Sequence, residues 1–304
     1  MMTRQKTLTV FTCTYNRAHT LVRTYESLCR QTSDDFLWIV VDDGSTDNTR
    51  EKVEQWKREG KLEIEYIHKD NGGLLSGYNT AIEHIETPLC TCIDSDDYMP
   101  DDAVESIIDF WAKNGSDSYA GMIGLDTYTD GQPIGGYFPD SLHETYLSYF
   151  YKWHQGDVKM VHRTELLKKV APMPLFAGEK FANPICYHLA IDLELPMLVA
   201  NKALCVVEYQ DKSNSMSKNL FYQFVQSPKS FARMRVLNMK NRRMPYLMRL
   251  RNAIHYTSSC LLAKDGQWLR NTPMPITTII TGPLGIALAA YLKWQTRHAT
   301  SYDI

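Results

Sequence analysis

Residues 36–47 read FLWIVVDDGSTD, a β-rich apolar run that ends abruptly in acids and small polar residues. The apolar part has the uninterrupted pattern of a strand whose two faces are both buried. Asp42, Asp43, Gly44 and Ser45 then supply residue types that form tight turns and begin helices. This stretch therefore predicts an inner strand of a parallel sheet, with a polar loop at its carboxyl end.

On both sides of this strand, short apolar runs alternate with stretches that have helical spacing. We expect further strands at residues 8–13, 62–67, 89–93 and 195–207. We expect helices at residues 18–30, from Ser45 or Thr46 to residue 58, at 74–85 and from Pro100 onward. This alternation is typical of βαβ units, so the sequence predicts an α/β fold with a mixed, mostly parallel sheet flanked by helices.

The composition is that of a folded protein. The chain has 304 residues, of which 44% are hydrophobic and 22% charged, enough to bury a sizeable core. Its first residues are polar and basic and lack the apolar segment of a secretory signal. Its seven cysteines are odd in number and fit neither a zinc site nor a disulfide framework. These features predict a cytoplasmic protein.

The net charge of −2 conceals two parts of opposite charge. Residues 1–220 carry 21 Lys and Arg against 33 Asp and Glu, whereas residues 221–304 carry 12 against 2. A change of this size along the chain indicates a domain boundary. We therefore expect a main domain over residues 1–220 and a basic helical tail over residues 221–304.

Polar clusters follow three of the predicted strands. Thr14-Tyr15-Asn16-Arg17 comes after the first, Asp42-Asp43-Gly44-Ser45 after the second and Asp94-Ser95-Asp96-Asp97 after the fourth. The carboxyl ends of parallel strands meet at one edge of a sheet, where α/β proteins bind their ligands. Turn and helix-cap chemistry explains any one cluster equally well, but three clusters at one edge favour a binding site.

The third cluster contains three carboxylates within four residues. They repel one another unless a cation compensates their charge. Oxygen ligands two residues apart at the end of a strand suit a small divalent cation, which in turn neutralises a diphosphate. The cluster therefore predicts a site for Mn²⁺ or Mg²⁺ at Asp94 and Asp96.

In this order and spacing the clusters resemble family-2 glycosyltransferases with the GT-A fold. The resemblance rests on Thr14-Tyr15-Asn16-Arg17 with Leu21, residues 40–49 (VVDDGSTDNT), Asn71-Gly72-Gly73 through Asn79, and Asp94-Ser95-Asp96-Asp97. It covers residues 7–115 closely and extends more loosely to residue 220. It implies an inverting transferase that takes a sugar from a nucleotide-sugar, with a donor-binding half over residues 1–115 and an acceptor-binding half over residues 116–220.

The resemblance also implies roles for single residues. The implied donor site consists of Thr14, Tyr15, Asn16, Arg17, Asp43, Asn71, Gly73, Asn79, Asp94 and Ser95. Tyr15 is expected to stack on the base, and Asp43 to accept a hydrogen bond from the uracil imide. Asp94 and Asp96 are expected to hold the ribose and the metal. A carboxylate favours uracil over cytosine, which lacks that N–H donor, so a UDP-sugar is the expected donor.

Inversion in a single displacement needs a base that takes the proton of the acceptor hydroxyl. Gly178-Glu179-Lys180-Phe181 resembles the family's Glu-Asp signature but has Lys180 where the Asp often stands. Glu179 is therefore the first candidate base, and Asp157, on an upstream turn, is the second. For either residue the alternative is an exposed surface acid.

A second departure from the family lies between Gly73 and Asn79, where relatives often carry a basic residue and this chain has apolar and aromatic ones. The leaving diphosphate then depends more on the metal and on cations from elsewhere. Lys218, in the run NSMSKN at residues 214–219, resembles a residue near the donor site of close relatives and is the expected additional contact.

The basic tail has the pattern of a membrane-binding segment. Residues 221–251 interleave eight Lys and Arg with apolar residues, which is typical of an amphipathic helix on an anionic membrane surface. Residues 276–294 are apolar and about long enough to span, but Gly282-Pro283 splits them, which favours an interfacial segment. Lys293 and Trp294 suit the headgroup level. We expect peripheral attachment to the inner face of the cell membrane; packing on the main domain or on a second subunit of a homo-oligomer is the alternative.

Two other classes of protein stay open. A non-catalytic nucleotide-binding or assembly protein is compatible with the departures at Lys180 and at residues 74–75. A nucleotidylyltransferase needs a Gly-rich, basic phosphate loop near its N-terminus, which this chain lacks. Nucleic acid is not an expected partner, because the acidic main domain repels a polyanion. A glycan or lipid-linked glycan acceptor in surface polysaccharide assembly agrees with both the resemblance and the tail.

Overall fold

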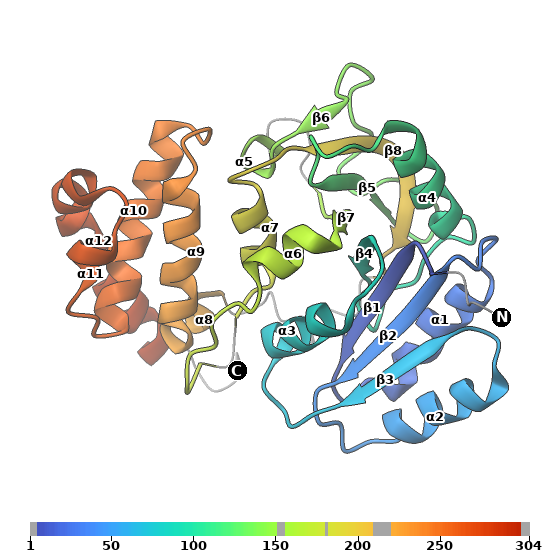
Figure 1. Ribbon diagram of the computed structural model, residues 1–304. Helices are drawn as coiled ribbons and strands as arrows, with labels where there is room; N and C mark the ends of the chain where they lie inside the picture. The colour runs from blue at the N-terminus through green and yellow to red at the C-terminus, as the bar shows by residue number, and fades with distance from the viewer. Residues whose placement is uncertain (1–4, 151–155, 180–181, 209–219, 299–304) are drawn as a thin grey trace. The chain divides into compact units, whose positions relative to one another are not determined.

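The strand predicted around residues 36–41 is an inner strand of an eight-stranded sheet, β2 (Phe36–Asp42). The computed structural model describes residues 5–150, 156–179, 182–208 and 220–298 (Figure 1). They form two units: a sheet unit, Met1–Pro172 with Glu194–Glu208, and a helical unit, Met173–Leu193 with Tyr209–Ile304. The division differs from the boundary expected at residue 220, because Met173–Leu193 groups with the C-terminal helices.

The sheet has the strand order β3-β2-β1-β4-β7-β5-β8-β6. The parallel pairs are β2 with β1 (Leu8–Thr14) and β3 (Ile64–His68), β1 with β4 (Leu89–Cys92), and β5 (Gly121–Thr127) with β8 (Met197–Val206). The antiparallel pairs are β7 (Val158–Arg163) with β4 and β5, and β6 (Glu144–Thr145) with β8. The predicted α/β class with a mixed, mostly parallel sheet is confirmed.

The helices of the sheet unit follow the predicted alternation. They are α1 (Ala18–Cys29), α2 (Thr49–Glu59), α3 (Leu74–His84), α4 (Ala103–Asn114), α5 (Leu147–Phe150) and α6 (Thr164–Val170). The prediction that α2 begins at Ser45 or Thr46 is wrong. Both the amide and the hydroxyl of Thr49 donate to Asp47 Oδ1, at 3.1 and 2.5 Å, and the helix begins there.

Three stacked aromatic rings form the centre of the core between β2, α1 and α2. The ring centroids of Tyr25 and Trp56 are 4.3 Å apart, and those of Trp38 and Trp56 are 6.1 Å apart. All three rings are buried. Trp38 Nε1 donates to Thr12 Oγ1 at 3.0 Å, so the indole N–H keeps a partner inside the core. This packing holds β1 and β2 rigidly under the loops that follow them.

The strand register brings the predicted polar clusters to one edge. Thr14, the last residue of β1, lies opposite Asp42, and Asp42 lies opposite His68 at the end of β3. Phe11 lies opposite Cys92, the last residue of β4. The loops that follow β1, β2 and β4 therefore leave the sheet on the same side.

The helical unit contains six helices in its described residues. They are α7 (Ile185–Ile191), α8 (Leu220–Gln226), α9 (Pro228–Lys240), α10 (Tyr246–Leu262), α11 (Trp268–Asn271) and α12 (Pro275–His298). The expected single amphipathic helix over residues 221–251 is wrong, because Pro228 and Pro245 interrupt it. Neither proline has a backbone N–H to donate to a preceding helical turn, and each lies where a new helix begins.

α12 runs unbroken through Gly282 and Pro283, so the predicted split is wrong. Close packing on α10 supports this helix: a Cβ added to Gly285 would lie 2.5 Å from Thr257 Cβ, which leaves room for glycine only. Of the described residues, Pro275–Thr296 forms a helix that is long and apolar enough to cross a membrane by length and composition. Its mean hydropathy is 1.5, and 33% of its most apolar window is buried.

Candidate functional site

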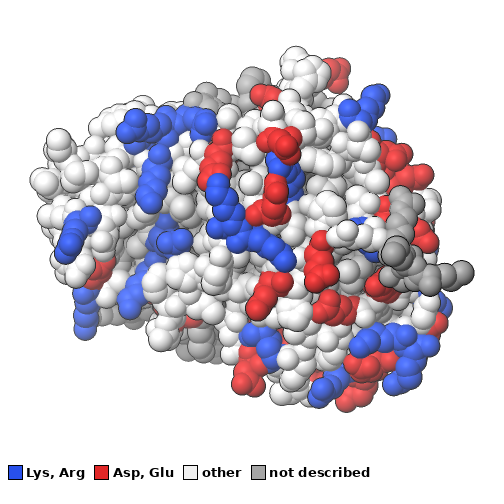
Figure 2. All heavy atoms as spheres, viewed as in Figure 1, with Lys and Arg blue, Asp and Glu red and all other residues white. Residues whose placement is uncertain are grey.

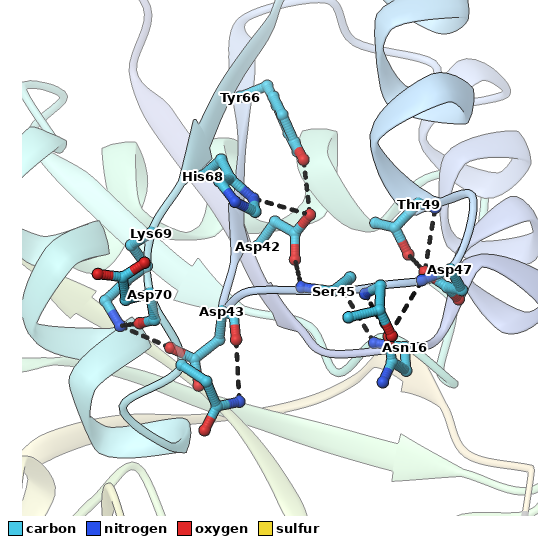
Figure 3. A network of polar contacts seen from close by, with 12 residues as sticks. Asn16, Asp42, Asp43, Ser45, Asp47, Thr49, Tyr66, His68, Lys69 and Asp70 are labelled. Atoms are coloured by element: carbon cyan, nitrogen blue, oxygen red, sulfur yellow. Dashed lines mark hydrogen bonds and ion pairs between the residues drawn. The ribbon is translucent and has the colours of Figure 1, made fainter.

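Asn16 joins the turn after β1 to the loop after β2 (Figure 3). Its Oδ1 accepts the amide N–H groups of Thr46 at 2.7 Å and Asp47 at 3.3 Å, and its own amide donates to Ser45 Oγ at 2.9 Å. Asn16 has a φ of 53°, in the left-handed region that Asn adopts more readily than most residues. The two loops therefore form one hydrogen-bonded rim at the edge of the sheet.

Asp42 supports this rim from inside the protein. It is fully buried and accepts hydrogen bonds from the Ser45 amide at 2.8 Å and the Tyr66 hydroxyl at 2.6 Å, while His68 Nδ1 lies 3.4 Å away. Burial by itself raises the pKa of Asp42, but these hydrogen bonds together bring it below its ordinary value. Asp42 is thus an ionised structural residue that ties β2 to β3.

Asp43 holds the segment that follows β3. Its Oδ1 accepts hydrogen bonds from Lys69 Nζ at 2.6 Å and the Gly72 amide at 3.0 Å, and its Oδ2 accepts the Gly73 amide at 2.7 Å. Asn71 Nδ2 donates to the backbone oxygen of Asp43 at 2.9 Å. An ionised carboxylate has about four lone-pair positions, so these three bonds leave Asp43 with room for one further donor.

Several predicted donor residues lie on or beside this rim. Tyr15, next to Asn16, is 48% exposed, so part of its side chain is open to solvent. Asn71 and Gly73 both contact Asp43 directly. Thr14 is buried, and its Oγ1 has no hydrogen-bond partner in the part of the chain that the structure describes. Asn79 lies within α3, farther along the same segment.

The residues from Asp94 to Asp97 follow β4 and have different surroundings. Asp94 is exposed, Asp96 is partly buried, and Ser95 and Asp97 are buried. Asp96 Oδ2 lies 3.8 Å from Nη1 of Arg17, so a cation on the rim faces this carboxylate. Partial desolvation raises the pKa of the Asp94 carboxyl group; the charge of Lys159 opposes this shift, and the charges of Asp96 and Asp157 add to it.

Two charged residues behind this loop were not predicted: Asp126 on β5 and Lys159 on β7. Burial raises the pKa of Asp97 to about 7 and that of Asp126 to about 6, and Lys159 opposes both shifts. Burial lowers the pKa of Lys159, but Cys205 and the neighbouring carboxylates raise it by more. The Cys205 thiol donates to Asp97 Oδ2 at 3.8 Å. Lys159 therefore acts as an internal counter-ion to the acidic loop.

A sequence signal for these two residues was present. Asp126 lies in the strand GMIGLDT and Lys159 in the strand VKMVHR, each among apolar neighbours. A charged residue within a buried strand needs a partner of opposite charge, which is a reason to look for one on an adjacent strand. β5 and β7 are such neighbours.

The loop after β4 carries carboxylates, the side-chain type that binds small divalent cations. In residues 5–150, 156–179, 182–208 and 220–298, no three His, Cys, Asp or Glu side chains are grouped closely enough to hold a metal. Mg²⁺ and similar ions often bind one or two carboxylates and take their other ligands from substrate phosphates and water. Asp94 and Asp96 have solvent access, whereas Asp97 does not, and they fit that arrangement.

The two candidate bases lie in different units. Asp157 is exposed in the sheet unit, immediately before β7, and its charge adds to burial in raising the pKa of Asp94 and of Asp126. Asp157 is therefore electrostatically part of the acidic edge.

Glu179 lies in the helical unit and binds the N-terminus of α9. Its carboxylate accepts the amide N–H groups of Lys229 at 2.7 Å and Ser230 at 2.8 Å, and the hydroxyl of Ser230 at 2.7 Å. These donors make Glu179 a helix-capping residue. Lys180 and the predicted donor contact Lys218 lie outside the described residues.

An open, mostly parallel sheet with an exposed aromatic ring, a hydrogen-bonded rim and acids at the carboxyl edge of its strands is typical of α/β proteins that bind a ligand at this edge. The family model described as "Glycosyl transferase family 2" matches residues 9–165. The match covers more than half of the chain, so the chain belongs to this family and carries a glycosyltransferase domain. The resemblance inferred from the motifs is confirmed.

Individual relatives match shorter stretches. Poly(ribitol-phosphate) beta-N-acetylglucosaminyltransferase TarP of Staphylococcus aureus (strain N315) is 29% identical over 125 residues, which is 40% of this chain and 38% of that protein. Chondroitin synthase of Escherichia coli is 32% identical over 107 residues, 35% of this chain and 16% of that protein. The chain thus spans well under half the length of the curated relatives it matches.

Solved structures match nearly the whole chain. S. aureus TarS 1-349 in complex with UDP-GlcNAc superposes with a TM-score of 0.62 at 18% identity, covering 97% of this chain and 93% of that one. The mannosyltransferase PcManGT from Pyrobaculum calidifontis, in complex with GDP-Man and Mn²⁺, has a TM-score of 0.57 at 15% identity, covering 96% and 88%. At these identities the likeness establishes the fold, and the predicted GT-A architecture is confirmed.

Replacement of Asn16 tests the rim. Asn16→Ala removes the Oδ1 hydrogen bonds and forces a Cβ-bearing residue without a compensating side chain into the left-handed region. We expect it to lower the free energy of unfolding by about 2–4 kcal/mol. Asn16→Gly loses the same bonds without the backbone strain and is expected to cost about 1–2 kcal/mol. Urea unfolding followed by tryptophan fluorescence measures both; an Ala variant as stable as the parent contradicts this account.

Proposed function

We propose that this protein is an inverting, metal-dependent glycosyltransferase that moves a sugar from a UDP-sugar to a hydroxyl group of a glycan or lipid-linked glycan. The observation that carries the proposal is the single edge at which Tyr15, Asp43 and the Asp94–Asp96 loop emerge from neighbouring parallel strands. Structural neighbours solved with UDP, UDP-GlcNAc and GDP-Man support a nucleotide-sugar donor. Relatives named for teichoic acid and chondroitin synthesis support surface polysaccharide assembly as the pathway.

In this proposal the rim binds the nucleoside. The exposed ring of Tyr15 stacks on the base, which gives affinity with little base selectivity. Asp43 accepts the imide N–H of uracil at its remaining lone-pair position. Thr14, Asn71 and Gly73 line the same rim, and Asn79 and Ser95 complete the donor site inferred from the family resemblance.

In the same proposal the acidic loop lies beside the diphosphate of the donor. Asp94 and Asp96 would hold Mn²⁺ or Mg²⁺, and that ion would supply positive charge to compensate the departing diphosphate. Arg17, 3.8 Å from Asp96, is placed to give a second positive charge to a phosphate oxygen. The Mn²⁺ of the neighbouring mannosyltransferase supports a metal of this class.

The metal proposal predicts the behaviour of Asp96→Ala. The variant is expected to lose the Mn²⁺-dependent part of UDP binding in calorimetric titration while its circular dichroism spectrum stays unchanged, because Asp96 is partly exposed and its ion pair with Arg17 lies at the surface. Asp109→Ala, which removes an exposed carboxylate from α4, is the matched control and should bind UDP as the parent does. Metal-dependent binding by Asp96→Ala would remove the metal assignment.

For the base, the contacts favour Asp157 over Glu179. A base needs a free lone pair that faces the acceptor hydroxyl. Three donors already occupy the carboxylate of Glu179, whereas Asp157 is exposed and electrostatically coupled to Asp94. The family resemblance supports Glu179, so both residues stay in the proposal as alternatives, with Asp157 first.

The two alternatives give opposite results in a pair of isosteric variants. If Asp157 is the base, Asp157→Asn lowers turnover by about a hundredfold or more with little change in UDP affinity. Glu179→Gln then changes turnover far less and lowers the stability of the helical unit by about 0.5–2 kcal/mol, because it weakens a helix cap. A large loss of turnover in Glu179→Gln alone reverses the assignment.

Two rival functions give different products. A nucleotidylyltransferase releases pyrophosphate, whereas the proposed transferase releases UDP together with a transferred sugar. A non-catalytic nucleotide-binding or assembly protein binds UDP without consuming any UDP-sugar. Assay of UDP and pyrophosphate from one reaction therefore tests the proposal against both rivals.

We further propose that the helical unit lies on an anionic membrane at the inner face of the cell. Most buried residues of α12 are small or polar: Thr278, Thr281, Gly282, Gly285 and Ala289, with the larger Leu292 near the end of the helix. All of its isoleucines are exposed, with Ile276 at 73% and Ile280 at 72%. A helix whose apolar side chains face outward exposes apolar surface that a lipid bilayer covers.

The charge of the helical unit agrees with this surface. In the face drawn in Figure 2, Lys and Arg lie over the helical unit with few acids among them, whereas acids gather over the sheet unit. Tyr291 and Trp294 are exposed near the end of α12, beside Lys293, as at a lipid headgroup layer. Because α12 packs along α10, which carries Arg249 and Arg251, we propose that it lies in the interface instead of crossing it.

Vesicle sedimentation tests this surface. We expect the protein to sediment with phosphatidylglycerol vesicles, less with neutral phosphatidylcholine, and less at high salt. Ile276→Glu with Ile280→Glu should weaken the binding at least tenfold, because two charges enter the apolar layer. Leu175→Glu, which changes an exposed apolar residue outside α12, is the control. Absence of vesicle binding together with a stable dimer by light scattering would assign the apolar face to a second copy of the chain.

A further inference from the structure

Lys69, the first residue after β3, is placed where the donor base is expected to bind. Its backbone amide donates to the Asp42 oxygen at 3.0 Å, which fixes its position beside the end of β2. Its Nζ donates to Asp43 Oδ1 at 2.6 Å and to the backbone oxygen of Asp70 at 2.5 Å (Figure 3). Lys69 lies outside the sequence motifs on which the family resemblance rests.

The ammonium group of Lys69 has one donor left over. An ammonium has three N–H groups, and in the part of the chain that the structure describes two of them have acceptors. The side chain is 20% exposed, so a ligand can reach it. A Cβ added to Gly72 would lie 3.1 Å from Nζ, so a larger residue at Gly72 would crowd the ammonium group.

Asp43 is only 4% exposed and keeps one lone-pair position, and the ammonium group of Lys69 beside it keeps one N–H in the described part of the chain. We propose that the two side chains read the edge of the nucleobase together, with Asp43 accepting a base N–H and Lys69 donating to the adjacent base carbonyl. The inference rests on the proposed donor site and adds to it the residue that determines base specificity.

The chemistry of the bases decides which of them this pair accepts. Uracil has an N–H donor beside a carbonyl acceptor on this edge, so both contacts form. Cytosine has the reverse order, a ring nitrogen acceptor beside an amino donor, so it faces like groups at both positions. Guanine presents the same N–H and carbonyl order as uracil. The pair therefore separates uracil and guanine from cytosine and adenine, and does not itself sense the size of the ring.

Lys69 also compensates for a charge missing from the next segment. The positions between Gly73 and Asn79 carry no basic residue, so α3 contributes no cation to the base edge. Lys69 has its ammonium at the same carboxylate that the Gly72 and Gly73 amides bind. One cation therefore both keeps Asp43 in position and contacts the base.

The test compares UDP with CDP. In calorimetric titration with Mn²⁺, Lys69→Met is expected to weaken UDP binding by about tenfold to a hundredfold, as for the loss of a charge-assisted hydrogen bond. CDP binding should change by less than about threefold, because the amino group of cytosine no longer faces the Lys69 ammonium group. The selectivity for UDP over CDP therefore falls. Lys69→Arg can still donate to Asp43 and to the base carbonyl, so it should keep the preference for UDP over CDP. Lys61→Met, at a lysine that is 61% exposed, is the matched control.

Each result has a separate meaning. If Lys69→Met weakens the binding of UDP and of CDP equally, the preference for UDP is kept. Lys69 then only positions Asp43 and the inference is wrong, while the proposed donor site stands. If the parent protein binds neither UDP nor GDP with Mn²⁺, the donor site itself fails. Urea unfolding of Lys69→Met shows whether a loss of UDP binding comes from an unfolded protein. If Lys69→Met is unfolded, Lys69→Gln, which keeps a neutral donor, is titrated in its place. Its preference for UDP over CDP should lie between those of the parent and of a protein without the preference.

Discussion

Two consecutive carboxylates at the end of β2 hold the candidate site together, and they do so on opposite sides of the strand. Successive side chains of a strand point to opposite faces, so Asp42 and Asp43 meet different neighbours. Both residues are buried, but Asp42 turns to Tyr66, whereas Asp43 turns to Lys69 and the loop after β3. One residue fixes the strands and the other organises the surface that a ligand meets. The rim joined by Asn16 and the position of Lys69 both depend on this division.

Much of this arrangement could be predicted from the sequence, because strand and turn chemistry act locally. The apolar run before Asp42 predicted β2, and parallel register then brought Thr14 and Asp94 to the same edge. Charged residues within apolar strands indicate that the acids have partners, but which residues these are could not be predicted, because they come from parts of the chain distant in sequence. Lys159 reaches the acidic loop only through the pairing of β7 with β4, and Glu179 meets α9 through a tertiary contact about fifty residues along the chain.

The tail shows a second limit of sequence patterns. Hydrophobic periodicity identifies the two faces of a helix but assumes that the apolar face is the buried one. In α12 Gly285 is buried because only glycine allows the approach to Thr257, Thr278 and Thr281 are buried on the same helix, and the isoleucines are exposed. The same composition had suggested a broken helix at Pro283, whereas packing on α10 keeps it continuous. Composition therefore indicated an apolar segment, and only packing shows which face of it needs a partner.

The acidic edge itself opposes folding. An unfolded aspartate ionises near pH 4, at about 3.9. In the folded protein the pKa of Asp97 is about 7 and that of Asp126 about 6, so both groups lower the stability progressively as the pH rises from about 4 to 7. Lys159 acts in the other direction: its raised pKa contributes stability throughout the range below about 10.4, the unfolded value of lysine. The aromatic core under β2 supports an edge that is electrostatically unfavourable, and such local conflict with the fold is characteristic of a surface shaped for binding a cation and its ligand.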